Sequence, residues 1–344
     1  PSQPGRNGTT AAADLERGWL AVTALNSNKP DTVSSYANSC GVAANYCLAA
    51  PGEAVFIDPQ STGSTSSLYY GGGTSYAAPL VSGAAALVWE KYPYFTNDLV
   101  RQTLLGTATD LGDPGVDGTI GHGLLNVAAA INGPGRFDWG TVTVDVPNLP
   151  TANIWSNDIS GAGGLVKRGP GRLVLTGTNT YSGETRVSNG SLGLSGQGSI
   201  QGTVYVGMDR EPGMQRAVLS FGSGTPQVNG SVLNNFGVQV LAPNSNPVIN
   251  GDYYQTSDAY LSVALGGSAL HVTGTAEFYG YLDVLNYISG YVPSGTLEVQ
   301  TVLTADGGIS NSRFRSIRQG GFVTLVNPFL NYDANNVYLG FDRA

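Results

Sequence analysis

One serine in the chain stands in a context that suits nucleophilic chemistry. The segment YYGGGTSYAAPLVSGAAALVWEKYP, residues 69–93, places Ser75 after a run of glycines and before an apolar stretch. A serine hydroxyl becomes an effective nucleophile only when a base removes its proton. The chain has two histidines that offer such a base, His122 and His271, and both follow Ser75. The pattern alone allows two interpretations: Ser75 is a nucleophile, or it is the N-cap of a helix after a glycine-rich turn.

The residues around the serine predict a helix that positions it. Residues 74–90 are apolar on every side, which is typical of a buried helix. Pro79 is expected in the first turn, where a missing N–H costs little. Free N–H groups and the positive end of the helix dipole then face Ser75, and this favours the oxyanion of acyl transfer. The glycines at 71–73 leave room for a substrate backbone.

Short apolar segments alternate with helical ones up to about residue 133. Residues 18–25 and 54–57 predict buried strands, because both are short and apolar. A second helix is expected to begin near residue 96, with Thr96 or Asn97 as its N-cap. Strands that alternate with helices indicate an α/β unit, which we place at residues 1–133.

The pattern changes after about residue 140, where we expect strands and no helix. Leu173, Leu175, Val187, Leu192 and Leu194 alternate with polar residues, which is the period of a strand. The strands are short, and Gly, Asn and Ser separate them. This favours a right-handed solenoid of short strands over the alternative, a β-sandwich. Residues 134–160 are the expected junction, and 161–344 the all-β part.

Composition limits the function classes. The 344 residues suffice for about two domains, and apolar residues reach 41%. Charged residues are 12% and the net charge is −8 without a basic run, so we expect no nucleic-acid partner. The longest nearly apolar run, 77–89, is too short to span a bilayer. The first residues lack the apolar segment of a signal peptide, so we expect a processed product or a part of a longer precursor.

Two further clusters bear on metals and redox state. Cys40 and Cys47 enclose a short loop, which favours a local disulfide over two buried thiols and places the protein outside the cytoplasm. Zinc is not expected, because no histidine lies near in sequence. Residues 110–118, DLGDPGVDG, have a composition that suits calcium, but their spacing differs from an EF-hand and a solvated turn is favoured. We therefore expect no metal and no organic cofactor.

The serine segment is more specific than a generic nucleophile motif. GTSYAAPLVSG resembles the serine signature of subtilisin-like proteases, the subtilases. The upstream segments GWLAVTALN, VSSYANSCG and CLAAPGEAV are similar to the strand, loop and APG turn that precede that serine. GVDGTIGHGLLNVAAAI is similar to the closing turn and last helix of the family. The resemblance covers about residues 15–132 and implies that Ser75 is the nucleophile and that its N–H is one arm of the oxyanion hole.

Subtilases carry their triad in the order Asp, His, Ser. None of residues 1–74 is a histidine, and a base at His122 or His271 breaks the family order, so neither is expected to act as one. The resemblance thus implies that residues 1–133 are the C-terminal half of a catalytic domain. The triad Asp and His are expected in a missing N-terminal half, which is the partner of this part, and the chain alone is expected to be inactive.

Residues 163–196, GGLVKRGPGRLVLTGTNTYSGETRVSNGSLGLSG, resemble the passenger-associated repeat of bacterial autotransporters. The matching positions are Gly171, Leu173, Leu175, Gly177, Asn179, Tyr181, Gly183 and Thr185. The resemblance implies a right-handed parallel β-helical stalk with a C-terminal, autochaperone-like cap. It also implies a C-terminal membrane β-barrel translocator in the precursor, and display outside a Gram-negative cell or on its surface.

Together the two resemblances describe autotransporter serine proteases. The expected function is a secreted or outer-membrane-displayed subtilisin-like serine endopeptidase that acts on peptide or protein substrates. The alternative is a non-catalytic surface adhesin or antigen with a silent protease remnant. Aromatic residues at 251–292 are expected to pack between strands, with a glycan-binding strip as the alternative.

Overall fold

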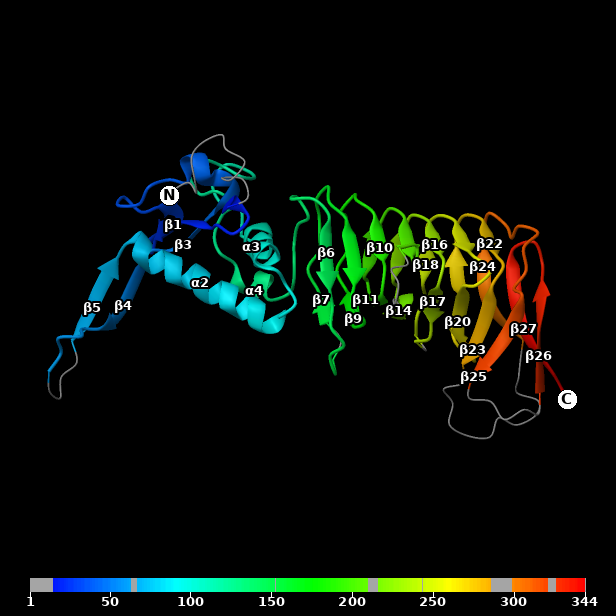
Figure 1. Ribbon diagram of the computed structural model, residues 1–344. Coiled ribbons are helices and arrows are strands. Elements are labelled where there is room, and N and C mark those ends of the chain that lie inside the picture. Colours follow the sequence, from blue (N-terminus) through cyan, green and yellow to red (C-terminus); the bar gives the residue numbers. More distant parts are fainter. Residues whose placement is uncertain are drawn as a thin grey trace. The chain divides into compact units, whose positions relative to one another are not determined.

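The computed structural model describes residues 15–62, 67–151, 153–209, 216–242, 244–285, 299–320 and 326–343. The chain divides into two compact units, Pro1–Arg136 and Phe137–Ala344. Figure 1 labels the elements of both units.

The described residues of the first unit include a small sheet and the helices α2 (Thr74–Lys91), α3 (Asn97–Gly106) and α4 (Val127–Ala130) (Figure 1). Strand β1 (Ala21–Asn26) pairs in parallel with β3 (Cys47–Pro51) and antiparallel with β2 (Lys29–Val33). The 3₁₀ helix η1 (Gly41–Tyr46) leads into β3, and helices α2, α3 and α4 follow. Strands β4 (Glu53–Ile57) and β5 (Leu68–Gly72) form a separate antiparallel pair. The predicted mixture of strands and helices is therefore present.

The start of α3 follows from local capping chemistry. Thr96 is the N-cap, and its Oγ1 accepts a hydrogen bond from the N–H of Leu99 at 3.1 Å. This bond satisfies one of the N–H groups that the first turn of a helix leaves without a partner. Of the two N-caps that the sequence allowed, Thr96 is confirmed.

Helix α2 differs from the prediction in its burial. It begins at Thr74, but only one side is buried, along Ala77, Val81, Ala84 and Val88. On the other side three large apolar side chains are 44–48% exposed, those of Leu80, Leu87 and Trp89. The prediction of a helix buried on every side was therefore wrong. An apolar helix face can be buried, but its sequence does not say whether residues of the same unit cover it.

Two further expectations for this unit were also wrong. Val55 and Ile57 of β4 are 60% and 63% exposed, because β4 pairs only with β5 in a two-stranded sheet. Pro79 lies at the sixth position of α2 and not in its first turn. A proline there lacks the N–H that would otherwise pair with the carbonyl of Ser75.

The second unit is built from three mostly parallel sheets. The first sheet contains β6 (Val142–Asp145), β8 (Leu165–Arg168), β10 (Thr185–Val187), β13 (Val204–Val206), β16 (Val232–Asn234), β19 (Tyr253–Gln255) and β22 (Ala276–Phe278). The second contains β7 (Asn153–Trp155), β9 (Arg172–Leu175), β11 (Gly190–Gly196), β14 (Ala217–Gly224), β17 (Gly237–Val240), β20 (Tyr260–Ala264), β23 (Tyr281–Leu285) and β25 (Ser316–Gly320). The third contains β12 (Ser199–Gln201), β15 (Gln227–Asn229), β18 (Val248–Ile249), β21 (Leu270–Val272), β24 (Gln300–Ala305), β26 (Val326–Tyr332) and β27 (Asn336–Arg343).

The order of these strands along the chain is regular. From β10 to β24 the chain visits the first, second and third sheets in turn, as the row of strands in Figure 1 shows. Neighbouring strands pair in parallel throughout, except for β24 with β27 and β26 with β27, which are antiparallel. The described residues of this unit contain no helix, as predicted.

Ladders of aliphatic side chains form the core of the second unit. Leu173 of β9 is in register with Leu192 of β11, which is in register with Leu219 of β14, and all three are fully buried. Asn179 is buried as well. Its Oδ1 accepts from the N–H of Ile159 at 3.0 Å and its Nδ2 donates to the carbonyl of Ser199 at 2.8 Å. This side chain thus replaces main-chain pairing at a corner between strands.

Candidate active site around Ser75

The turn before Ser75 is held by main-chain hydrogen bonds. The N–H of Gly73 donates to the carbonyl of Gly52 at 2.8 Å, and the N–H of Tyr76 donates to the carbonyl of Gly73 at 3.0 Å. Gly73 is the N-cap of α2, so Ser75 is the second residue of the helix and not its cap. The N-cap interpretation of Ser75 is therefore wrong.

The glycines before the serine make room for the protein's own side chains. A Cβ at Gly71 would overlap the phenol ring of Tyr76. That ring stacks on Phe56 of β4, with 5.6 Å between the ring centroids. Gly71 therefore allows the β4–β5 pair to pack against the first turn of α2. The sequence suggested space for a substrate and missed this contact.

The main-chain groups of Ser75 have no partners within the helix. The first N–H groups of a helix have no carbonyl one turn earlier to bond with, and Ser75 is the second residue of α2. Pro79 supplies no N–H to the carbonyl of Ser75. The N–H of Ser75 is thus free to donate to a developing negative charge, with the positive end of the helix dipole behind it.

The side chain of Ser75 lies at an open depression. Ser75 is exposed, and a pocket of about 290 Å³ adjoins it. The pocket is lined by Trp19, Leu20, Ala21, Val22, Thr74, Ser75 and Ala78. One wall is the start of β1 and the other is the first turn of α2. Trp19 and Ala78 were not predicted at the site, because only the fold brings the residues before β1 beside the start of α2.

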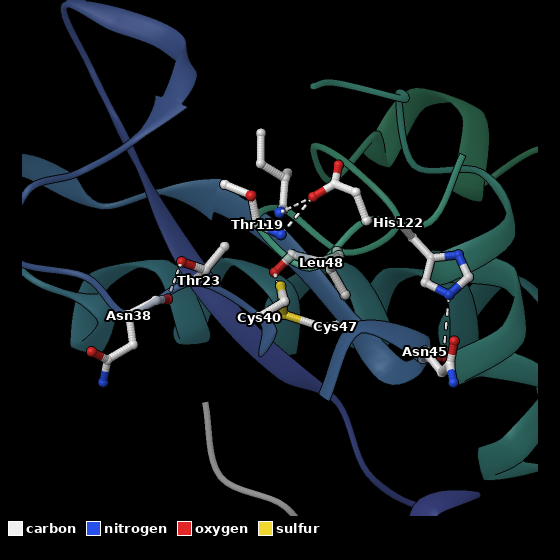
Figure 2. The surroundings of a disulfide bond; sticks show 10 residues. Thr23, Asn38, Cys40, Asn45, Cys47, Leu48, Thr119 and His122 are labelled. Atoms are coloured by element: carbon white, nitrogen blue, oxygen red, sulfur yellow. Dashed lines mark hydrogen bonds between the residues drawn. A yellow bond between two sulfur atoms is a disulfide. The ribbon is translucent and has the colours of Figure 1, made fainter. Parts of the chain in front are cut away.

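Both histidines are engaged elsewhere. The Nε2 atom of His122 lies 3.2 Å from the carbonyl oxygen of Asn45, and the main-chain N–H of His122 donates to the carbonyl of Cys47 at 2.9 Å. Figure 2 shows the imidazole directed toward Asn45. In the second unit, Nε2 of His271 lies 3.0 Å from a carboxylate oxygen of Asp306. Neither of these contacts involves Ser75.

A disulfide bond joins Cys40 and Cys47, as predicted (Figure 2). The bond spans η1, and the N–H of Cys40 donates to the carbonyl of Thr119 at 3.1 Å. Cys47 begins β3, and Gly52 just after β3 accepts the hydrogen bond from Gly73. The disulfide therefore anchors the strand that supports the turn before Ser75.

The aspartate-rich segment is a turn that its own carboxylates stabilise. Asp117 Oδ1 accepts hydrogen bonds from the N–H groups of Thr119 and Ile120 at 2.6 and 2.8 Å, and Asp110 Oδ2 accepts from Gly115 at 2.8 Å. Among the described residues, no group of three or more His, Cys, Asp or Glu could hold a metal ion. Of the helices described, none has the length and apolar character needed to cross a membrane.

Sequence comparisons agree with both halves of this description. Residues 2–123 match the subtilase family, and residues 165–194 match the passenger-associated-transport-repeat. The Neisserial autotransporter lipoprotein NalP of Neisseria meningitidis is 36% identical over 293 residues, which are 83% of this chain and 25% of that protein. An extracellular serine protease of Serratia marcescens is 28% identical over 97% of the chain and 36% of its own length.

A third relative lies outside the proteases by name. The adhesin BmaC autotransporter of Brucella suis is 31% identical over 94% of this chain and 9% of its own length. The chain spans about a quarter to a third of the two relatives named before it. The matches support a secreted or outer-membrane-surface autotransporter passenger that carries a subtilase segment.

Proposed function

Starting from an autotransporter passenger that carries a subtilase segment, we propose that this chain is the serine-bearing part of a secreted serine endopeptidase. In this proposal the Oγ of Ser75 attacks a peptide carbonyl and a histidine base takes its proton. The C–N bond then breaks, the histidine gives that proton to the leaving amine, and water hydrolyses the acyl-enzyme to release the acid and free Ser75. The N–H of Ser75 stabilises the oxyanion of each tetrahedral intermediate. This scheme calls on no metal or organic cofactor.

The observation that carries the proposal is the presentation of Ser75. An exposed hydroxyl stands at the second position of α2, with a free N–H on the same residue and a pocket of about 290 Å³ beside it. A serine whose only role is to cap the start of a helix would occupy the N-cap position. Here Gly73 occupies that position.

We place the triad Asp and His in an N-terminal half of the domain that lies outside these 344 residues, so that the chain alone is inactive. The apolar surface of the first unit supports this placement. The outer side of α2 exposes Leu80, Leu87 and Trp89, and the β4–β5 pair exposes Val55 and Ile57. Apolar surface of this kind usually belongs to an interface. The occupant that we propose for it is the missing half of the same catalytic domain.

For the second unit we propose a right-handed parallel β-helix, closed at its C-terminal end by the antiparallel β26–β27 pair. The three sheets and the regular order of visits to them support this fold. We assign 1–133 to the catalytic part, 134–160 to the junction and 161–344 to the stalk and cap. The division of the chain between Arg136 and Phe137 falls within the proposed junction. In the precursor, the proposed partner is a C-terminal membrane translocator.

Reconstitution tests the proposed activity. The chain is purified with and without the upstream half and treated with a fluorophosphonate probe, and casein hydrolysis is then measured. We expect labelling and hydrolysis only in the reconstituted sample, and a fall in kcat of about 10⁶-fold for Ser75→Ala. Ser82→Ala is the matched control, because Ser82 is an exposed serine of the same helix that donates to the carbonyl of Ala78.

The alternative function is a surface adhesin or antigen in which the protease part is silent. The observation in its favour is the similarity to BmaC along 94% of the chain. Equal hydrolysis by wild type and Ser75→Ala in the reconstituted sample would favour this alternative. Strong labelling of Ser75 in the chain alone, with no companion polypeptide by intact mass, would instead overturn the placement of the triad in a missing half.

A further inference from the structure

The outer face of the second sheet carries polar side chains on several of its strands. The inward residues Leu192 and Leu219 are buried, so the residues next to them on β11 and β14 face outward. In register on this face are Gly193 of β11, Ser220 of β14 and Gln239 of β17. Ser191 and Arg172 lie one alternation earlier, on β11 and β9.

Two adjoining depressions cover this part of the face. Their volumes are about 340 and 420 Å³, and Arg172, Ser191 and Gln239 line both of them. Arg216 lines the second. Gly193 has only a hydrogen atom as its side chain, which leaves space on this face. A Cβ at Gly193 would lie 3.2 Å from Oγ of Ser220 and 3.4 Å from Nη2 of Arg172. The guanidinium of Arg172 therefore extends across β11 into the depression.

The charge of the depression is opposite to that of the chain. The net charge of the protein is −8, yet the lining residues include two arginines and no carboxylate. The described residues provide neither Arg172 nor Arg216 with an ion pair. On the same face, the carboxylate of Asp283 is already held by Nε and Nη2 of Arg318, at 2.6 and 2.9 Å. Two guanidiniums that share one concave surface attract an anion.

The polar groups at one end of the depression are held in place. The side chain of Gln239 lies beside the phenol of Tyr260. The ring of Tyr260 lies directly over Gly237, where any Cβ would overlap it, and it packs edge-to-face on Phe236 with 5.8 Å between centroids. A polar side chain that is fixed before binding loses less conformational freedom when a ligand arrives.

We propose that this depression binds an acidic oligosaccharide, whose carboxylate or sulfate groups pair with Arg172 and Arg216. Strands β11 and β14 are paired in parallel on both sides, so their main-chain groups are not offered to a peptide strand. Recognition must come from guanidinium, amide and hydroxyl groups. Hydroxyl and amide groups of this kind stand on β11 (Ser191), β14 (Ser220) and β17 (Gln239), about 4.8 Å apart from strand to strand, which suits an extended ligand.

Binding of defined hexasaccharides to the full chain tests the proposal. The probes are an oligogalacturonate hexamer, which carries carboxylates, and a heparin hexasaccharide, which carries sulfates as well. We expect at least one of them to bind. We expect Arg172→Gln and Arg216→Gln each to raise its Kd about tenfold, because each removes a charge-assisted contact. Fully methyl-esterified galacturonate hexamer is the neutral control and is expected to bind more weakly than the acid.

A matched control variant tests whether binding depends on these two arginines or only on the total positive charge of the protein. Arg186→Gln removes an arginine of the first sheet, which is paired with Glu184 and Asp209, and is expected to leave the Kd unchanged. Unchanged far-UV circular dichroism shows that each variant is folded. Failure of both hexasaccharides to bind, equal Kd values in the Arg172 and Arg186 variants, or equally tight binding of a poly-glutamate peptide would each overturn the proposal. None of these readouts depends on Ser75 or on proteolysis.

Discussion

The two units of this protein bury their apolar residues to different extents. In the second unit each strand covers its neighbours, so that Leu173, Leu192 and Leu219 are fully buried within one chain. In the first unit the helix that carries Ser75 is covered on one side only, and Leu87 and Trp89 on its other side are exposed. A ladder of repeated strands completes its own core, whereas the first unit leaves one side of α2 uncovered.

The largest expected effect on stability in this comparison is at a buried leucine of the second unit. Leu173→Ala removes buried apolar volume from a ladder with aliphatic neighbours on β11. We expect the free energy of unfolding of this unit to fall by about 2–5 kcal/mol. Hydrogen exchange of peptides from residues 165–240 measures it. Unchanged protection would show that the core is not shared between strands in the way described.

Loss of the disulfide is expected to destabilise the first unit alone. Cys40→Ser with Cys47→Ser removes the bond across η1 and lets the unfolded chain gain entropy. We expect a loss of about 2–3 kcal/mol in unfolding free energy. Hydrogen exchange around β3 is expected to rise while that of residues 165–240 stays the same. Faster exchange in both regions would mean that the two units do not unfold independently.

A pH effect near neutral pH is expected in the second unit. Lys167 is fully buried, and its Nζ donates to the carbonyls of Gly169, Gly171 and Asn189. Burial lowers the pKa of Lys167 from 10.5 to about 7, with a smaller opposing effect of Asp145. Between these two values the unfolded state binds more protons than the folded state, so stability rises with pH.

The expected gain is about 1 kcal/mol in unfolding free energy between pH 7 and pH 8, relative to Lys167→Met. Urea unfolding of both proteins at several pH values measures the difference. If the difference does not change between pH 7 and pH 8, the contacts with the three carbonyls keep the ammonium charged and outweigh burial.

The smallest change in stability is expected at an exposed leucine of α2. Leu87→Ala makes the same substitution as Leu173→Ala, but at a side chain that is 48% exposed. We expect a change of about 0.5 kcal/mol or less in the stability of the chain by itself. The same variant is expected to weaken association with the upstream half in a pull-down titration. A large loss of stability in the isolated chain would show that this face is already covered.

Much of the secondary structure follows from local patterns in the sequence. The alternation at Leu173, Leu175, Leu192 and Leu194 predicts strands because side chains in a strand alternate between two faces. The start of α2 at Thr74 and the capping of α3 by Thr96 follow from glycine and hydroxyl residues at helix starts. The pairing of Cys40 with Cys47 was predictable because the loop between them is short.

Burial and proximity were not predictable, because they depend on residues far apart in the chain. The sequence of α2 is apolar all round, and only the packed unit shows which side has a partner. Asn179 bridges buried main-chain groups at Ile159 and Ser199, which its place in the repeat did not indicate. The strip of aromatic residues at 251–292 is divided: Tyr253 and Phe278 are buried, whereas Tyr254 and Tyr279 are exposed. Tyr287 and Tyr291 lie outside the described residues.

The sequence by itself determined which groups are present: a serine in a glycine-rich helix start, a cysteine pair and a series of short strands. These features depend on residue type and spacing over a few positions. The tertiary structure decided which groups meet. Arg172 and Arg216 share one depression only because β9, β11 and β14 stack in register, and Trp19 reaches Ser75 only because β1 lies beside α2. Contacts between residues far apart in the chain form where packing buries apolar surface, and a local sequence pattern does not predict them.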